Sequence, residues 1–308
     1  MKINNKKLKY AILTLIILII LLPLLLQNDY LILVADMGAI TGLLVLGLVV
    51  LVGFTGLLSL GQVAFYAIGA YTAAILSTSL GVSPWLGLLA AGVVSGICGI
   101  IIGLPSFNLK GPFLVIITIG FAEIVRILLL NLQSITGGPF GISQIPPLKI
   151  AGISLAEPLN FYYFIMIFIA ICIFGVSRLR ASRVGRALIS IRDDETAAEI
   201  MGVDVRRYKI ISFTISAVLA GFAGAFYACL TSYIVPDLFT FNESAQYLSM
   251  TVLGGFNPIG APLISVVLTI LPELLRGLKE YYMLFFSSIL LILIVIVAWR
   301  QQKASIDN

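Results

Sequence analysis

Long apolar runs, separated by glycine, proline or charged residues, dominate this sequence of 308 residues. A helix needs about 20 apolar residues to cross the hydrocarbon core of a bilayer, and many runs approach that length. Only 11% of the residues are charged, whereas a soluble domain carries about 25%. Because only helices and closed barrels satisfy their backbone within lipid, the pattern predicts an all-α polytopic membrane protein.

Breaks in these runs divide the chain into about ten segments, so we expect about eight to ten transmembrane helices in a single transmembrane domain, 1–308. The eighth and ninth segments are short and interrupted, and either could be re-entrant. The segments are 10–27, 31–52, 57–79, 85–104, 111–131, 160–178, 208–231, 244–256, 258–276 and 281–299.

Four lysines, Lys2, Lys6, Lys7 and Lys9, precede the first apolar run in the manner of a signal peptide. The exit "LLQNDY" lacks a small-x-small cleavage site, so we expect an uncleaved first membrane helix. With the N-terminus inside, 15 of the 19 Lys and Arg residues fall on the cytoplasmic side. The positive-inside rule therefore places both termini and the loop at 179–209 in the cytoplasm, and the loop at 132–160 outside.

One long polar segment, residues 182–209, interrupts the apolar sequence and carries 11 of the 33 charged residues (19 basic plus 14 acidic). A topology anchor that touches anionic lipid is one interpretation. However, its basic and acidic residues are nearly balanced, and the acids cluster in "RDDETAAE", which favours an element that docks on a protein.

The local pattern in this segment predicts two short helices, and the boundaries of one of them are given by particular residues. Asp193 or Asp194 can cap its start, Glu195 to Met201 form about two turns, and Gly202 supplies a stop. A short helix with a small apolar face suits docking into a protein groove. The side chains expected on that apolar face are Ala197, Ala198 and Met201.

The stretch "ETAAEIMG", Glu195 to Gly202, resembles the "EAA-x3-G" coupling loop of ABC importer permeases. Together with "GFTGLLSLGQVAFYAIGAY", "TGGPFGISQIPPL" and "VLGGFNPIGAP", it makes the chain similar to branched-chain amino acid permeases of the LivM type. The loop departs from a strict EAA motif at Thr196, and the Ile-x-Leu-Pro of other importer classes is absent.

This resemblance implies a multi-pass subunit of the prokaryotic plasma (inner) membrane that imports branched-chain or similar apolar amino acids by alternating access. It implies a second permease subunit, two ABC ATPase subunits that hold ATP and Mg, and an extracytoplasmic solute-binding protein, with no nucleic-acid partner. The residues it implies for coupling to the ATPase are Gly185, Arg186, Asp194, Glu195, Ala197, Ala198, Met201 and Gly202. A permease for urea or short amides is an alternative.

The chain is not expected to be an enzyme or to bind a cofactor itself. The stretch "GLLSLGQV", Gly56 to Val63, has P-loop glycine spacing, but Gln62 and Val63 stand where Lys and Ser or Thr are needed. There is no histidine, which excludes Ser-His-Asp triads and most metal sites. The three cysteines stand singly within apolar runs.

An ion-coupled secondary transporter is a second alternative, because ionisable residues within spans often carry ion coupling. Glu123 and Arg126 are three apart on one expected helix and should neutralise each other. Asp36 is expected to be close enough to the membrane interface to be hydrated.

Two interrupted regions are candidates for the substrate path, because broken helices expose N–H and C=O groups that can satisfy a zwitterion. Ser59-x-x-Gln62 is a candidate capping box for the helix that follows the first break. Both regions could also be ordinary turns. The residues expected to line the path are Gly61, Gln62, Phe65, Tyr71, Gly254 and Gly255.

Two ridges of small residues predict close helix contacts, either within the chain or with a second permease subunit. They are Gly92, Gly96, Gly99 and Gly103, and Ala217, Ala220, Gly221, Gly224 and Ala228. The outer loop is expected to be ordered by turns and could receive a solute-binding protein.

Overall fold

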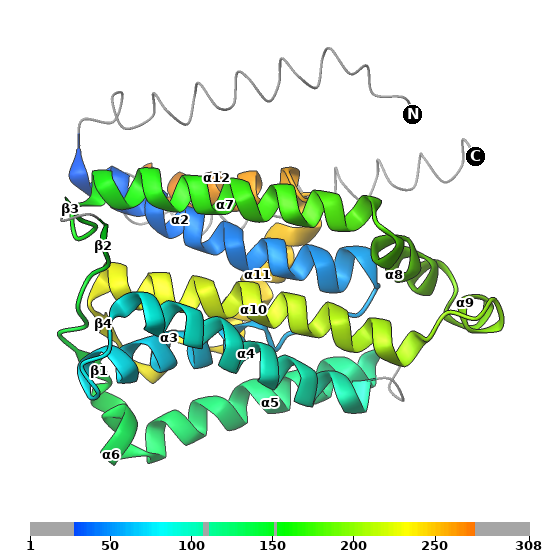
Figure 1. The fold of residues 1–308 in the computed structure, drawn as a ribbon, viewed down its shortest axis with the longest axis horizontal. Helices are drawn as coiled ribbons and strands as arrows, with labels where there is room; N and C mark the ends of the chain where they lie inside the picture. The colour runs from blue at the N-terminus through cyan, green and yellow to red at the C-terminus, as the bar shows by residue number, and fades with distance from the viewer. Residues whose placement is uncertain (1–27, 107–110, 151–152, 275–308) are drawn as a thin grey trace, which may run out of the picture.

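The computed structural model describes residues 28–106, 111–150 and 153–274, most of which form helices along one long axis (Figure 1). The helices are α2 (Asp29–Leu48), the π-helix η1 (Val49–Phe54), α3 (Gln62–Thr78), α4 (Pro84–Ser106), α5 (Pro112–Asn131), α6 (Gln133–Thr136), the 3-10 helix η2 (Gly138–Phe140), α7 (Pro158–Ala181), α8 (Arg183–Asp193), α9 (Glu195–Ile200), α10 (Val205–Thr231), the 3-10 helix η3 (Pro236–Leu238), α11 (Phe241–Leu253) and α12 (Gly260–Leu274). The strands are β1 (Ile142–Ser143), β2 (Lys149–Ile150), β3 (Ile153–Ser154) and β4 (Tyr233–Ile234).

The described residues confirm a polytopic α-helical membrane protein, because five of their helices are long and apolar enough to cross a bilayer. These spans are Asp29–Phe54, Pro84–Pro105, Pro112–Asn131, Pro158–Ala181 and Val205–Thr231. The segments expected at 10–27 and 281–299 lie outside the described residues. The segment expected at 57–79 is shorter than predicted, since α3 begins only at Gln62.

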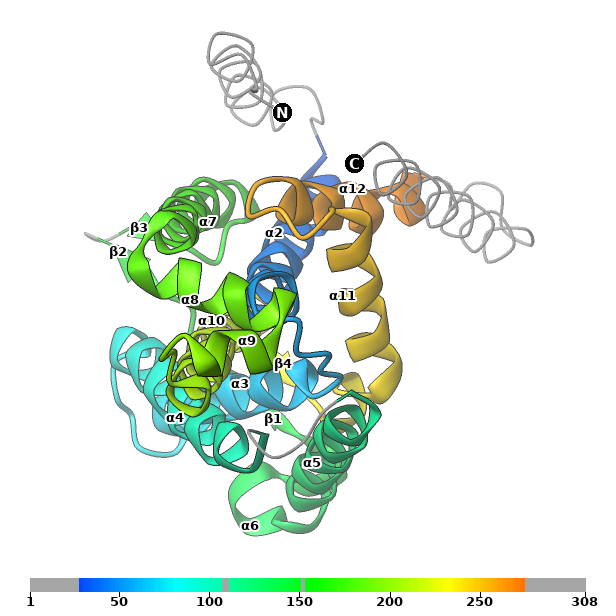
Figure 2. The ribbon, with the colours of Figure 1, turned by 90° about the vertical axis from the view of Figure 1, so that its right-hand side faces the viewer.

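The eighth and ninth expected segments form α11 and α12, joined by a turn. α11 has 13 residues, fewer than a full crossing needs. In Figure 2, α11 runs between α12 at one of its ends and α5 at the other. α12 packs along α2, where Gly38 approaches Val266 and Gly42 approaches Ser265 and Pro262.

Both ridges of small residues are buried inside the chain, the first against α10 and the second against α3 and α4. A Cβ on Gly92 would lie 2.6 Å from Phe222, one on Gly96 2.8 Å from Val218, and one on Gly99 2.6 Å from Ala217. The interpretation as packing within the subunit is confirmed, and the alternative of contact with a second subunit is wrong for these residues. On its other side α10 meets α3, where Gly69 and Gly224 bring the two backbones together.

The polar segment and the outer loop lie at opposite ends of the bundle (Figure 1). At one end β1 pairs antiparallel with β4, with Ile142 opposite Ile234, and β2 pairs with β3. The described part of the outer loop is ordered by turns, as expected, with Gly137 and Gly141 at φ angles of 74° and 66°. At the other end α8 and α9 project from α7 and α10.

Substituting Gly69 by valine should weaken the packing of α3 against α10, because its side chain would collide with the Gly221 backbone. Overpacking of this kind costs about 3 kcal/mol. We expect a lower midpoint of thermal denaturation for purified Gly69→Val. The matched control is Gly175→Val on α7, where nothing lies within 4 Å. Equal midpoints for the two variants would contradict the close approach.

Candidate functional site

Two short helices with well-defined caps build the projecting polar segment (Figures 1 and 2). Ser182 Oγ accepts from the Gly185 N–H at 3.2 Å and caps α8. Asp194 Oδ1 accepts from the Ala197 N–H at 2.9 Å and caps α9. Gly202 follows α9 with φ at 85°, a left-handed conformation that favours glycine. The predicted cap, helix and stop are confirmed.

Gly185 and Arg186 form the corner between α7 and α8. A Cβ on Gly185 would collide with the backbone carbonyls of Leu179 and Arg180, so the corner requires glycine. Arg186 Nη1 donates to the Ala181 carbonyl at 3.0 Å, which satisfies a free C=O at the end of α7. Both residues therefore fix the direction in which α8 leaves the membrane domain.

The exposed apolar tip of α9 differs from the prediction. Ala198 is only 5% exposed and packs with Ile191 and Val205, so its place in an exposed patch is wrong. Ile200 and Met201 are 80% and 82% exposed instead. The reason is that the short helix needs one apolar residue to hold it against α8 and α10. We call the exposed side chains of Ala197, Ile200 and Met201 the tip patch.

A buried ion pair joins α9 to α10. Lys209 Nζ lies 3.0 Å from Glu195 Oε1, and the lysine side chain is 1% exposed. A buried cation is tolerated when a counter-charge lies beside it, so Glu195 holds the base of α9 against the membrane domain.

A second contact joins α8 to the end of η1. Arg192 Nη1 donates to the Gly53 carbonyl at 2.7 Å. A Cβ on Gly53 would lie 2.9 Å from the side chain of Phe256, in the turn between α11 and α12. The polar segment thus reaches both interrupted regions through one arginine.

Sequence reasoning missed Ile200, Arg192 and Lys209. An exposed isoleucine three residues after Ala197 is visible in the helix periodicity. The partner of Arg192 lies 139 residues away in the sequence, and that of Lys209 lies on a different helix, so local periodicity predicts neither contact.

The first interrupted region runs without helical structure from Thr55 to Gly61, and α3 then begins inside the bundle. Hydroxyl groups of two other helices accept from one N–H group in this region and from one at the start of α3. The Leu60 N–H donates to Thr118 Oγ1 of α5 at 3.1 Å, and the Val63 N–H donates to Ser244 Oγ of α11 at 3.1 Å. The predicted capping box is wrong: Ser59 Oγ accepts from the Gly61 N–H at 3.2 Å, before α3 begins.

The side chains expected to line a path around this break are buried in packing contacts. Gln62 Nε2 donates to the carbonyls of Leu44 and Ser216, at 3.3 and 3.4 Å. Its Oε1 accepts from Ser216 Oγ at 3.0 Å, so Gln62 ties α3 to α2 and α10. Phe65 packs on Phe121, with ring centroids 5.4 Å apart.

Tyr71 lies further along α3 and is also buried, with its ring 6.1 Å from that of Phe239. Gly61 lets α3 approach α5, since a Cβ there would lie 2.9 Å from the Thr118 carbonyl. In the second interrupted region, Gly254 touches Ala261 and Gly255 has φ at 66°. The two regions meet at Gly53 and Phe256, but the structure does not gather these predicted side chains around one space.

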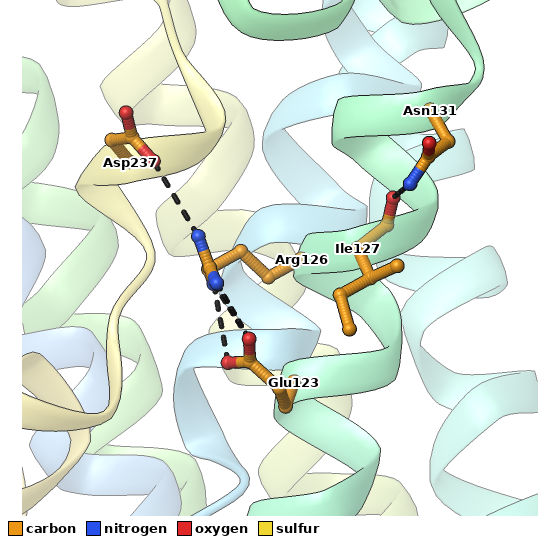
Figure 3. Close-up of polar contacts among 5 residues, drawn as sticks. All are labelled: Glu123, Arg126, Ile127, Asn131 and Asp237. Carbon is orange, nitrogen blue, oxygen red and sulfur yellow. Dashed lines mark hydrogen bonds and ion pairs between the residues drawn. The ribbon is translucent and has the colours of Figure 1, made fainter.

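The ionisable residues within spans have different surroundings. The expectation that Asp36 is hydrated is wrong, because it is fully buried and its carboxylate makes no hydrogen bond to the described residues. Tyr162 of α7 lies near it. The predicted neutralisation of Glu123 by Arg126 is confirmed: Arg126 Nε and Nη2 donate to the Glu123 carboxylate at 3.1 and 2.5 Å (Figure 3).

Comparisons with known proteins show which family the chain belongs to. The family described as "branched-chain amino acid transport system / permease component" matches residues 30–297. The chain is 41% identical over 275 residues to the high-affinity branched-chain amino acid transport system permease protein LivM of Salmonella typhimurium, covering 82% of this chain and 65% of that protein. It is 40% identical to LivM of Escherichia coli, with the same coverage.

A more distant relative is a probable branched-chain amino acid transport permease protein LivM of Methanocaldococcus jannaschii, 25% identical over 220 residues, covering 68% of this chain and 63% of that protein. The chain thus spans less than two thirds of the length of each of these three relatives. No solved structure matches it.

Neutralising Glu195 should destabilise the base of α9, because Lys209 would stay buried without a counter-charge. Breaking a buried pair costs about 3 kcal/mol. We expect Glu195→Gln to lower the midpoint of thermal denaturation, and Glu199→Gln, an exposed change on the same helix, to leave it unaltered. Adding Lys209→Met should recover most of the loss. A double variant no more stable than Glu195→Gln would argue against this role of the pair.

Proposed function

This chain belongs to the permease-component family of branched-chain amino acid transport systems, and from that premise we propose that it is the membrane subunit of an ATP-driven importer for branched-chain or similar apolar amino acids. The observation that carries the proposal is the projecting α8–α9 segment, which exposes apolar side chains at its tip and is anchored by buried contacts at its base. Such an element suits the transfer of force from a partner into the membrane domain.

The partner at the tip patch is an ABC ATPase. Ile200 and Met201 are large apolar side chains on an otherwise polar segment, and covering each contributes about 2 kcal/mol. Two such ATPases hold the ATP and Mg, whose hydrolysis supplies the energy. The caps at Ser182 and Asp194 and the corner at Gly185 keep the tip in a fixed orientation for docking.

Force on α9 has two routes into the membrane domain. One passes through Glu195 and Lys209 to α10. The other passes through Arg192 to the Gly53 carbonyl and from there to the turn that contains Phe256. Because η1 and that turn border both interrupted regions, movement of α8 alters the helices that would open and close the path. Alternating access follows from this arrangement.

The remaining partners and the orientation follow from the same scheme. The polar segment and both termini lie in the cytoplasm of a prokaryote, and the opposite end, with β1 to β4, receives an extracytoplasmic solute-binding protein. A second permease subunit, either a copy of this chain or a paralogue, completes the path.

Cross-linking from the tip patch tests the proposed ATPase partner. A cysteine at Met201, with the three native cysteines replaced, should capture an ABC ATPase in native membranes, because this side chain is 82% exposed. The captured protein is identified by mass spectrometry. A cysteine at Phe140, exposed in η2 just before β1, is the matched control and should capture none. Efficient labelling at position 201 without an ATPase would favour an ion-coupled transporter.

A charge within the tip patch should uncouple ATP hydrolysis from uptake. Met201→Glu places a carboxylate in an apolar contact without disturbing Ala198, which holds the helix in place. We expect leucine uptake by the reconstituted complex to fall about tenfold while the variant keeps its wild-type denaturation midpoint. Thr196→Glu, exposed but outside the tip patch, is the control. Unchanged uptake by Met201→Glu would count against docking through this face.

A further inference from the structure

The Glu123–Arg126 pair on α5 lies in a membrane span, and its side chains are nevertheless partly exposed. The Glu123 side chain is 47% exposed, and its neighbours Ile124 and Ile127 are exposed as well. A half-exposed carboxylate facing lipid is costly, and ionisable residues within spans usually face a water-filled cavity or the interior of a bundle. The edge of α5 that carries Glu123 therefore faces water or another protein.

The guanidinium of Arg126 is held firmly on one side and loosely on the other (Figure 3). Nε and Nη2 donate to Glu123, which fixes the position of the group. Nη1 lies 3.5 Å from Asp237 Oδ1 in η3, beyond the usual 2.7–3.2 Å of such a hydrogen bond. The Asp237 side chain is 76% exposed. One guanidinium nitrogen and one carboxylate thus stand side by side without a close bond between them.

We propose that the loose Arg126–Asp237 pair binds the charged groups of a free α-amino acid, an inference that rests on the proposed function. The amino acid carboxylate accepts from Arg126 Nη1, and its ammonium group donates to the Asp237 carboxylate. A zwitterion carries the two complementary charges a few ångströms apart, so it can lie across the pair on its exposed side and make both bonds. Glu123 is a positioning residue, because it holds the guanidinium and does not touch the ligand.

Charge and surroundings fit a zwitterion with an aliphatic side chain. The three side chains, two carboxylates and one guanidinium, carry a net charge of about −1 at neutral pH. This charge attracts the ammonium end, while Arg126 keeps the carboxylate end from being repelled. Ile127 and Leu238 directly follow Arg126 and Asp237 in the sequence and are exposed, so apolar surface lies near the pair. η3 follows β4, at the end of the bundle opposite α8 and α9, which places the site on the entry side.

The test uses a cysteine reporter beside the pair in the assembled complex. Ile127→Cys is made with Cys98, Cys172 and Cys229 replaced by alanine, and its reaction with a water-soluble thiol reagent is timed in membranes. Leucine should slow the reaction. Leucine without its ammonium group (4-methylpentanoate) and leucine without its carboxylate (isopentylamine) should each require about tenfold higher concentrations, because each forgoes one charged bond.

Asp237→Asn is then added to the Ile127→Cys variant. We expect it to raise about tenfold the leucine concentration that halves the rate of cysteine modification. Glu157→Gln, a change of another acidic residue in the outer loop, should leave it unaltered. An unreactive cysteine at 127 would show that this edge faces lipid or a dry interface and would overturn the inference. Reaction without protection by leucine, protection by isopentylamine equal to that by leucine, or no effect of Asp237→Asn would overturn it as well.

ATP-driven leucine uptake by the wild-type complex is measured in parallel, which separates the two proposals. Normal uptake together with a cysteine that leucine does not protect would contradict binding at this site, but it would not contradict the proposed function. Protection by leucine without ATP-driven uptake supports the binding site and counts against the ATP-driven mechanism.

Discussion

The need to satisfy backbone N–H groups away from water governs the centre of this protein. The chain leaves helical structure at the end of η1 and resumes it at Gln62, inside the bundle, where the first N–H groups of α3 have no carbonyl partners of their own. The Ser244 hydroxyl accepts from the Val63 N–H in this first turn, and the Thr118 hydroxyl accepts from the Leu60 N–H just before it. The start of α3 is therefore held jointly by α5 and α11, and the break persists only while both helices remain in place.

The packing of α10 supplies the rigid counterpart to this break. Small residues along α4 and α10 bring these helices close enough that a Cβ on Gly96 or Gly99 would clash with the facing helix, and Gly69 brings α3 equally close to α10. Close-packed helices of this kind move together more readily than they slide. Relative movement is thus concentrated where packing is interrupted, at Thr55–Gly61 and at the turn after α11.

Local patterns predicted much of the fold, and long-range contacts account for what they missed. The spans within the described residues, the cap at Asp194, the stop at Gly202 and the pairing of Glu123 with Arg126 all depend on neighbours within a few residues, so the sequence was sufficient for them. The cap of α3 depends on Ser244, 181 residues away from Val63. The inward direction of Ala198 depends on Ile191 and Val205 around it, which a helical pattern of six residues cannot specify.

The joint between the polar segment and the membrane domain depends on a main-chain oxygen. Arg192 binds the carbonyl of Gly53, so the contact depends on the position of a backbone oxygen and uses no side-chain group at position 53. Substitutions that preserve the wide turns of η1 leave the acceptor where it is, whereas a change elsewhere in η1 that restored ordinary α-helical turns would move it. The joint thus requires the guanidinium of Arg192, and it is vulnerable to changes of helical pitch several residues away from Gly53.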